Sequence, residues 1–279
     1  MATRLRSARN ATLRALDRIS LLAPIYRAYE RVRSLRGSED GDVDVGGLPV
    51  PPPRLRVEVA GTPGLEWFLD SGRQQAAIIR SAAERNGAPL ESTGSLLDFG
   101  CGCGRVLRHW AGLEGQEIHG SDFNERLVGW CAANLSFVTA SVNRLEPPLR
   151  YADGQFDLVY AISVFTHLPH ELERAWIDEL SRIVAPGGLL LLTTHGDSYA
   201  DRLDADERAQ YDAGDPVVRW PAVAGSNLCT TFHPEAYVRA RLAPGLELLE
   251  LTLDGGTVGS RQQDLVVFRK PAPGTAARS

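Results

Sequence analysis

LLDFGCGCGRVLRHW, residues 96–110, is the stretch that decides the fold, because a short apolar run passes directly into three glycines spaced as G-x-G-x-G. Residues 96–99 predict a buried strand, and residues 105–113 have the pattern of a helix. Glycines between a strand and a helix let the backbone approach a ligand closely at the carboxyl edge of a parallel sheet. The sequence therefore predicts either a ligand-binding loop or a tight structural turn at residues 100–104.

Strands and helices alternate around this loop. Continuous apolar strands separated by helices indicate an α/β fold whose parallel sheet is covered by helices on both faces. A helix at residues 65–86 precedes the loop, with Trp67 and Phe68 near its start. The other predicted strands are 116–120, 136–141, 156–162, 188–194 and 264–268, and the helices between them are 125–134 and 170–184.

The composition is that of an ordinary globular protein: 279 residues, 43% hydrophobic and 23% charged, with a formal net charge of −5. One α/β domain with appendages is expected. No apolar stretch approaches the ~20 residues of a membrane helix, and no signal-peptide pattern follows Met1. Four cysteines are too few for a disulfide framework, so a cytoplasmic protein with reduced thiols is predicted. Every basic residue except Lys270 is arginine, a skew that indicates a GC-rich, bacterial genome.

The N-terminal segment is strongly basic. Residues 1–36 carry nine arginines and only two acidic residues, Asp17 and Glu30, which gives this segment a net charge of +7. The rest of the chain therefore has a net charge of −12. That acidic remainder argues against a nucleic-acid substrate. The segment predicts a basic amphipathic helix, which could bind a membrane surface or an acidic partner, or could pack on its own domain or on a twin subunit. Its apolar positions at helical spacing are Leu5, Thr12, Leu13, Leu16 and Ile19.

An insertion follows the predicted strand at 188–194. Loops as long as residues 196–244 usually form lids or binding loops, and short helices are expected within it around 199–210 and 234–242. The predicted organisation is a basic helix and Gly/Pro-rich linker in residues 1–60, with the linker at 37–53, then a main domain in 61–270 and a disordered tail in 271–279.

The position of the third glycine distinguishes between ligands. A dinucleotide fingerprint has its last glycine one position later, where Arg105 stands. The loop instead resembles the G-x-G-x-G loop, preceded by an acid, of the class I S-adenosylmethionine-dependent methyltransferases. The resemblance covers about residues 65–195 and the strand at 264–268, and it implies a Rossmann-like, mostly parallel sheet of seven strands. Three later stretches also carry it: IHGSDFN at 118–124, VNRLEPPLRYADGQFDLVYAISVFTHL at 142–168 and VAPGGLLLLTTHG at 184–196.

Asp122 ends the second strand, 22 residues after Gly100, where a carboxylate can accept hydrogen bonds from both hydroxyls of a ribose. Capping of the next helix is its alternative role. The resemblance further implies that Asp98 orients the loop or meets the amino group of S-adenosylmethionine, and that Asn143 and the backbone of Arg144 meet the adenine. The full set expected to bind this cofactor is Asp98, Gly100, Cys101, Gly102, Gly104, Asp122, Phe123, Asn143, Arg144 and Ile162.

The methyl group of a sulfonium is already activated, so catalysis needs positioning and, for some acceptors, a base. Histidine suits proton removal near neutral pH, and His167 is the first candidate base, with His195 second. A metal site made from these two residues and His233 is conceivable, but no metal is expected, because paired i, i+4 spacing is lacking. The residues expected to contact the acceptor are Trp67, Phe68, His195, Tyr199, Asn227 and His233.

These observations predict methyl transfer to a small-molecule acceptor, with oxygen favoured and nitrogen or carbon possible. The acceptor is expected to come from bacterial secondary metabolism or glycan modification. Two alternatives remain: a scaffold of this fold that binds the cofactor without turnover, acting through a homodimer or a partner at its basic helix, and a nucleotide-dependent oxidoreductase.

Overall fold

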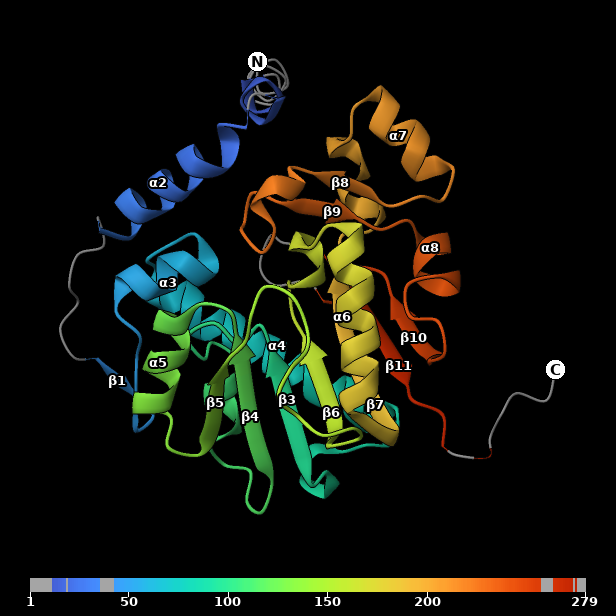
Figure 1. Cartoon of the computed structure of the whole chain (residues 1–279). Helices are drawn as coiled ribbons and strands as arrows, with labels where there is room; N and C mark the ends of the chain where they lie inside the picture. Colours follow the sequence, from blue (N-terminus) through green and yellow to red (C-terminus); the bar gives the residue numbers. More distant parts are fainter. Residues whose placement is uncertain (1–11, 19, 36–42, 257–262, 273, 275–279) are drawn as a thin grey trace.

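The computed structural model describes residues 12–18, 20–35, 43–256, 263–272 and 274. A seven-stranded sheet runs through the molecule, with helices on both sides (Figure 1). Its strands are β3 (Ser95–Phe99), β4 (Glu117–Asp122), β5 (Val138–Val142), β6 (Phe156–Ala161), β7 (Val184–Thr194), β10 (Glu247–Thr252) and β11 (Asp264–Arg269). Their order is β10-β11-β7-β6-β3-β4-β5, and only β11 runs antiparallel to its neighbours. This arrangement confirms the mostly parallel, seven-stranded sheet.

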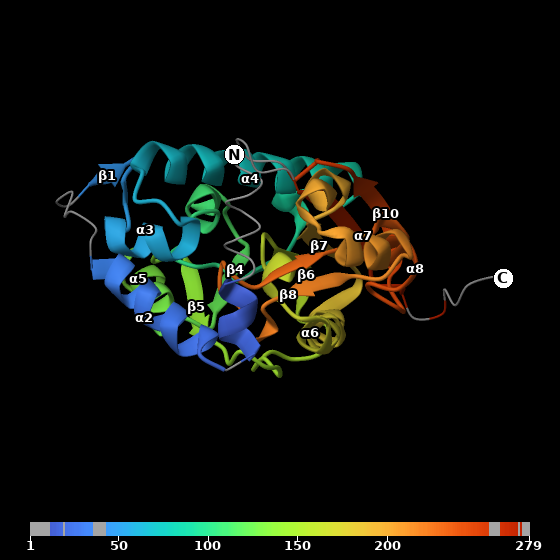
Figure 2. The same ribbon diagram turned by 90° about the horizontal axis from the view of Figure 1, so that it is seen from above.

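Alternation along the strands divides the core into two layers. In β6, Leu158 faces α4 (Leu65–Arg85), whereas its neighbour Val159 faces α6 (His170–Ile183). Successive side chains of a strand point to opposite faces, so an apolar strand buries both. Seen from above, α4 and α6 lie on opposite sides of the sheet (Figure 2).

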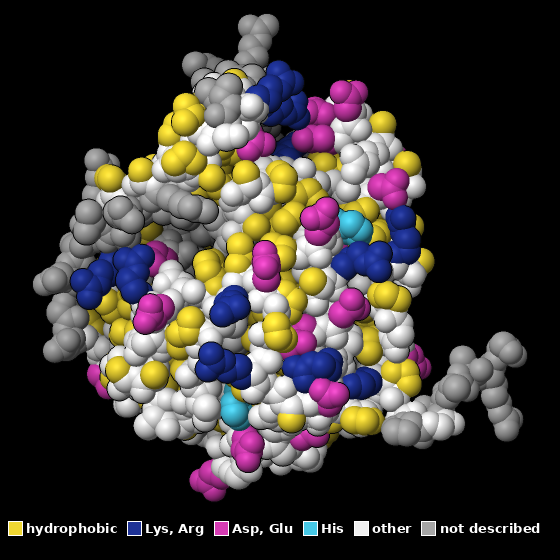
Figure 3. Space-filling view, viewed as in Figure 1, with side chains coloured by type: hydrophobic (Ala, Val, Ile, Leu, Met, Phe, Trp, Pro, Cys, Tyr) yellow, Lys and Arg dark blue, Asp and Glu magenta, His cyan; other side chains and the backbone are white. Residues whose placement is uncertain are grey.

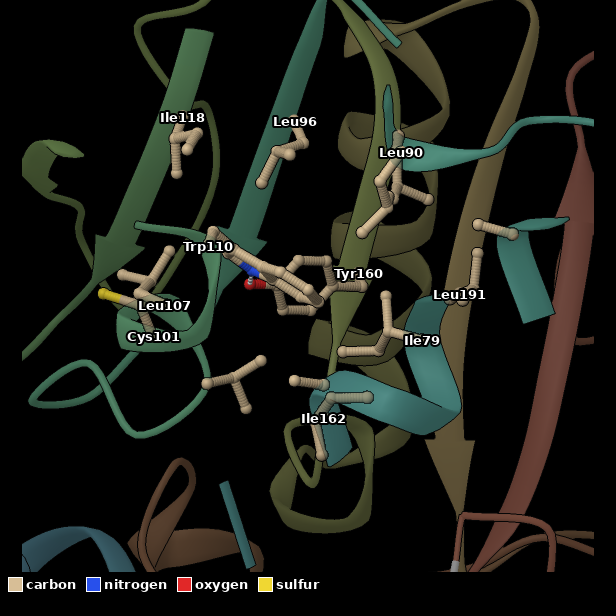
Figure 4. Packing of buried hydrophobic residues seen from close by; sticks show 14 of the residues in the cluster. Ile79, Leu90, Leu96, Cys101, Leu107, Trp110, Ile118, Tyr160, Ile162 and Leu191 are labelled. Atoms are coloured by element: carbon tan, nitrogen blue, oxygen red, sulfur yellow. Dashed lines mark hydrogen bonds between the residues drawn. The ribbon is translucent and has the colours of Figure 1, made fainter. Parts of the chain in front are cut away.

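Further helices complete the two layers. The α4 side also holds α5 (Glu125–Asn134), and the α6 side holds α8 (Glu235–Ala240). In the core on the α4 side, the indole Nε1 of Trp110 donates to the hydroxyl of Tyr160 at 2.8 Å (Figure 4). Three single turns of 3₁₀-helix connect elements around the sheet: η1 (Leu90–Ser92), η2 (Leu107–Trp110) and η3 (Phe165–His167).

The prediction of a helix at residues 105–113 is wrong, because the single 3₁₀ turn η2 is the only regular helical structure in that stretch. Helix α4 lies against this segment instead. A Cβ atom on Gly72 of α4 would lie only 2.2 Å from the carbonyl oxygen of Arg105. The two backbones are therefore in direct contact, and α4 occupies the space that a longer helix after the loop would need.

The insertion after β7 forms a small layer above the carboxyl edge of the sheet. Short helices occur in it as expected, but the antiparallel pair β8 and β9 was not predicted. We call residues 196–244 the lid. Besides α8 it contains η4 (Asp197–Arg202), α7 (Ala205–Asp212), β8 (Val217–Arg219), η5 (Pro221–Val223) and β9 (Thr230–Phe232).

The N-terminal segment packs on the lid. Residues 12–18 are helical, and a second helix, α2 (Leu22–Leu35), follows; Leu5 and Ile19 of the predicted helix lie outside the described residues. Leu22 of α2 is buried in a cluster with Trp220, Val223 and Cys229 of the lid. The described part of this segment therefore packs on its own domain.

The predicted linker is only partly described, since residues 36–42 fall outside the described ranges. Residues after it form the short pair β1 (Asp44–Val45) and β2 (Leu48–Pro49), and then α3 (Pro53–Ala60). Of the predicted tail, only residues 271, 272 and 274 are described.

Candidate active site

The glycine loop between β3 and η2 is held in a conformation that favours glycine. Gly100, Gly102 and Gly104 have φ values of 80°, 54° and 77°. A Cβ on Gly100 would lie 2.3 Å from Cγ2 of Val164, and one on Gly102 would lie 2.7 Å from Cγ2 of Val59. Larger residues at these positions would be strained and would collide with the segment after β6 and with α3. The loop is therefore closely enclosed by its own chain.

Asp122 ties the loop to the end of β4. One carboxylate oxygen accepts from the backbone N–H of Gly102 at 2.9 Å, and the other accepts from the N–H of Asn124 at 2.8 Å. The side chain is 8% exposed, and this burial raises the pKa of Asp122 above its usual range, against the effect of the amide hydrogen bonds. Asn124, not Asp122, caps α5 by accepting from the N–H of Arg126.

Asp98 is a second buried carboxyl, at the end region of β3 beside β4. Burial raises the pKa of Asp98 to about 7, although a hydrogen bond with Tyr160 and the charge of Arg105 lower it; the charge of Asp122 raises it further. Arg105 lies with its guanidinium carbon 5.8 Å from the centre of the Trp67 ring. A chain Trp110–Tyr160–Asp98 thus links the core to the loop.

These two carboxyls suit a ligand with a cationic group and neighbouring hydroxyls. Each oxygen of Asp122 accepts one backbone amide, and a carboxylate oxygen has a second lone pair for a hydroxyl donor. The pKa of Asp98 is raised because its hydrogen bond and the nearby charge of Arg105 do not fully offset the burial of its carboxylate. A bound ammonium group would stabilise this carboxylate. The two carboxyl groups therefore fit the ribose hydroxyls and the amino group of S-adenosylmethionine as hydrogen-bond acceptors.

The other residues expected at the cofactor surround the same edge. Asn143 accepts from the hydroxyl of Ser121 at 2.7 Å and donates to the carbonyl of Arg144 at 2.6 Å, so its side chain holds the β5 end in place. Phe123 is half exposed directly after Asp122. Cys101 and Ile162 are buried in the core on the α4 side, where Figure 4 shows them.

His167 and His195 lie together, as expected from neighbouring strand ends. Their ring centres are 6.2 Å apart in an edge-to-face arrangement. Nδ1 of His167 contacts the carbonyl oxygen of Cys229 at 2.7 Å, and the carbonyl of His167 accepts from the N–H of Gly225 at 2.9 Å. The lid therefore holds both the ring and the backbone of this histidine.

His195 is more deeply buried than His167. Its ring stacks on Tyr199 with centres 3.9 Å apart, and its Nδ1 is buried without a hydrogen-bond partner. Burial, followed by the charges of His167 and His233, holds the pKa of His195 well below its ordinary value. This histidine is therefore neutral at pH 7.

His233 is fully buried in a polar cluster behind the two histidines. Its Nε2 contacts a carboxylate oxygen of Glu173 at 2.5 Å, and the hydroxyl of Tyr237 donates to the other oxygen at 2.5 Å. Burial raises the pKa of Glu173, but the charge and hydrogen bond of His233, the hydrogen bond of Tyr237 and the charge of His170 together outweigh this effect, and the net shift is downward. The backbone N–H of His233 donates to the carbonyl of His195 at 2.8 Å.

The remaining residues expected at the acceptor are dispersed. Phe68 is fully buried in a cluster with Leu55, and Trp67 lies at the loop beside Arg105. Tyr199 belongs to the apolar core of the lid and faces His195. Asn227 donates to the carbonyl of Glu58 at 3.4 Å, which links the lid to α3.

Sequence reasoning missed the residues of α3 at this site. Val59 lies against Gly102, and Glu58 accepts from Asn124 at 2.9 Å beside Asp122. A signal existed, because Pro53 at the first turn and Gly61 after the last are typical helix boundaries. The close approach of the lid to Phe123 was also missed. A Cβ on Gly225 of the lid would lie 3.2 Å from Cε1 of Phe123, and no local sequence pattern indicates this proximity.

Within the ranges that the structure describes, no group of three or more His, Cys, Asp or Glu side chains could hold a metal ion. No helix found there is long and apolar enough to cross a bilayer.

Comparisons with known proteins point to one family. A family model described as a methyltransferase domain matches residues 71–251. Tocopherol O-methyltransferase of Arabidopsis thaliana is 29% identical over 182 residues, which cover 60% of this chain and 48% of that protein. A ubiquinone biosynthesis O-methyltransferase of Dictyostelium discoideum is 27% identical over 136 residues, covering 44% and 41%. The chain thus spans less than half the length of each relative.

Solved structures share the fold. A SAM-dependent methyltransferase from Methanosarcina mazei superposes with a TM-score of 0.50 at 18% identity, covering 65% of this chain and 94% of that one. The glycopeptide N-methyltransferase MtfA complexed with S-adenosylmethionine gives a TM-score of 0.50 at 16% identity, with 71% and 94% covered. At these identities the likeness concerns the fold alone.

Proposed function

The chain belongs to the methyltransferase family, as its sequence resemblance implied, and from this we propose that it transfers a methyl group from S-adenosylmethionine to an oxygen atom of a small-molecule acceptor. When bound, this cofactor supplies an electrophilic methyl group on its sulfonium. Asp122 would accept from the ribose hydroxyls while keeping its two backbone amides, and Asp98 would face the amino group. Phe123, Asn143 and the backbone of Arg144 would border the adenine.

The observation that carries the proposal is the fixed tautomer of His167. A carbonyl oxygen only accepts hydrogen bonds, so the 2.7 Å contact with Cys229 places a proton on Nδ1, and the neutral form of this ring carries its lone pair on Nε2. A histidine in this state can take a proton from a hydroxyl as the oxygen attacks, and its ring is held by the lid at the carboxyl edge of β6. His167 is therefore the proposed general base.

The surroundings of His167 suit an acceptor with one polar end. Tyr199 and Phe232 supply aromatic surface next to His195. Several side-chain atoms in this part of the molecule are buried and have no hydrogen-bond partner, and a hydroxyl-bearing acceptor could pair with them. These atoms are Oγ1 of Thr166, Oγ1 of Thr194, Nδ1 of His195, Oγ of Ser198 and Nδ1 of His233.

Oxygen is favoured because two of the relatives are named as O-methyltransferases. A relative from Gibberella zeae is named as a sterol 24-C-methyltransferase, so carbon is the second candidate acceptor atom. We further propose that the reaction is cytoplasmic and belongs to bacterial secondary metabolism or glycan modification, which the buried free thiols and the arginine-rich composition support. The spacing of the glycine loop disfavours an oxidoreductase.

Replacing the candidate base tests the proposal. His167→Ala is expected to lower turnover by ~10²–10⁴, while the Kd for S-adenosylhomocysteine stays unchanged. Turnover is measured as S-adenosylhomocysteine release on a panel of phenols, alcohols and amines. His170→Asn is the control, because its half-exposed side chain lies at the start of α6, where it contacts Tyr237 and Glu173 and not His167. Near-normal turnover of His167→Ala would refute its role as base, and product formed only from amines would refute oxygen as the acceptor atom.

A further inference from the structure

Helix α2 presents an apolar stripe to solvent. Leu21, directly before the helix, and Ile25, Tyr29 and Val32 within it are 46%, 47%, 53% and 48% exposed. The spacing of four and three residues places Ile25, Tyr29 and Val32 on one face of the helix. Leu21 lies at the start of this face, because its carbonyl oxygen accepts from the N–H of Ile25 at 3.2 Å. Figure 3 shows apolar side chains exposed along this helix. Such a continuous line differs from the single exposed hydrophobic residues that are normal on a protein surface.

The adjacent face of α2 is already occupied. Leu22 is buried against Trp220 and Val223 of the lid, and Ala23 and Tyr26 pack on the same cluster. The helix is thus anchored through one face, and its exposed stripe cannot turn inward without breaking this contact. The stripe is a fixed feature of the outer surface above the lid.

The charge of the segment indicates what the stripe meets. Residues 1–36 have a net charge of +7, whereas the rest of the chain has −12. Among the described residues of the segment, Arg18 is exposed and lies three residues before Leu21. An apolar stripe within a basic segment is the pattern of helices that lie in the headgroup region of anionic bilayers, and tyrosine favours that region.

We propose that α2 docks this protein on the surface of an anionic lipid bilayer, with Leu21, Ile25, Tyr29 and Val32 entering the headgroup region. A second copy of the chain fits less well, because a symmetric contact through α2 would bring two segments of +7 together. The docking surface stands apart from the proposed methyl transfer, since neither the glycine loop nor His167 contributes to it.

Vesicle sedimentation of the 279-residue chain tests this proposal. Wild-type protein is expected to pellet with vesicles of phosphatidylcholine and phosphatidylglycerol, and to pellet less with pure phosphatidylcholine or at high salt. Ile25→Glu should weaken binding to the mixed vesicles roughly tenfold or more, since it places a charge of the wrong sign in the apolar stripe. Leu253→Glu is the matched control, because Leu253 is 50% exposed at the end of β10, outside the basic segment.

Two further measurements keep the result interpretable. Thermal melting should show that Ile25→Glu stays folded, as expected for a substitution at an exposed position. Sedimentation velocity without lipid should give a state of association that Ile25→Glu does not change. The proposal is overturned if wild-type protein does not pellet with mixed vesicles, if both variants bind equally, or if Ile25→Glu instead dissociates a dimer.

Discussion

Asp98 changes charge near neutral pH, because burial raises its pKa to about 7. A ligand with an ammonium group binds the ionised form, so affinity should rise with pH through this range. The Kd of S-adenosylhomocysteine is expected to fall roughly tenfold between about pH 6 and about pH 8, as Asp98 loses its proton. Calorimetry checks this, and Asp98→Asn should bind weakly with little dependence on pH. The same pH dependence in the variant as in wild type would rule out Asp98 as its source.

Single residues were predictable where spacing along the chain fixes their place. Asp122 ends strand β4 and His167 follows strand β6, so each was expected at the carboxyl edge of the parallel sheet. Which of the adjacent aromatics Trp67 and Phe68 would face the core depends on the partners of α4, and these come from distant segments such as α3. The pairing of His233 with a carboxylate 60 residues earlier was equally beyond local patterns.

At the level of elements, α4 depends on a glycine. Gly72→Ala is expected to destabilise the fold by about 1–3 kcal/mol, because its Cβ would meet the carbonyl oxygen of Arg105 at 2.2 Å. Gly129→Ala in α5 is the control: nothing lies within 4 Å of its Cβ, and alanine should stabilise that helix by about 0.4–1 kcal/mol. Urea unfolding of both variants gives the comparison. Equal free energies of unfolding would contradict the close packing of α4 on the loop segment.

Most strands and long helices were predictable, because their apolar periodicity is strong. Helix α6 was expected at 170–184 and occurs at His170–Ile183, and α4 was expected at 65–86 and occurs at Leu65–Arg85. The helix expected at 105–113 failed because helical periodicity there competes with the packing of α4 on the same backbone. The pair β8–β9 was missed because strands of three residues are too short for a period-2 pattern.

At the scale of the whole molecule, α2 and the lid should behave as one unit on top of the sheet. Leu22→Ala is expected to cost about 2–5 kcal/mol of local stability, because Leu22 is 1% exposed between α2 and the lid. Leu21→Ala, at its half-exposed neighbour, should change stability by about 0.5 kcal/mol or less. Hydrogen exchange should therefore rise in residues 217–232 for Leu22→Ala while the sheet stays protected. Unchanged exchange there would mean that α2 does not support the lid.

The edge of the sheet where the glycine loop, Asp98 and Asp122 meet is proposed to hold S-adenosylmethionine, and direct binding tests this. Calorimetric titration of S-adenosylhomocysteine into protein freed of any bound ligand should give saturable binding by wild type. Asp122→Ala should raise the Kd tenfold or more, about 1.4 kcal/mol, because its contacts to Gly102 and to the ribose hydroxyls are lost together. No heat of binding with wild type, or an unchanged Kd in Asp122→Ala, would contradict the proposed site.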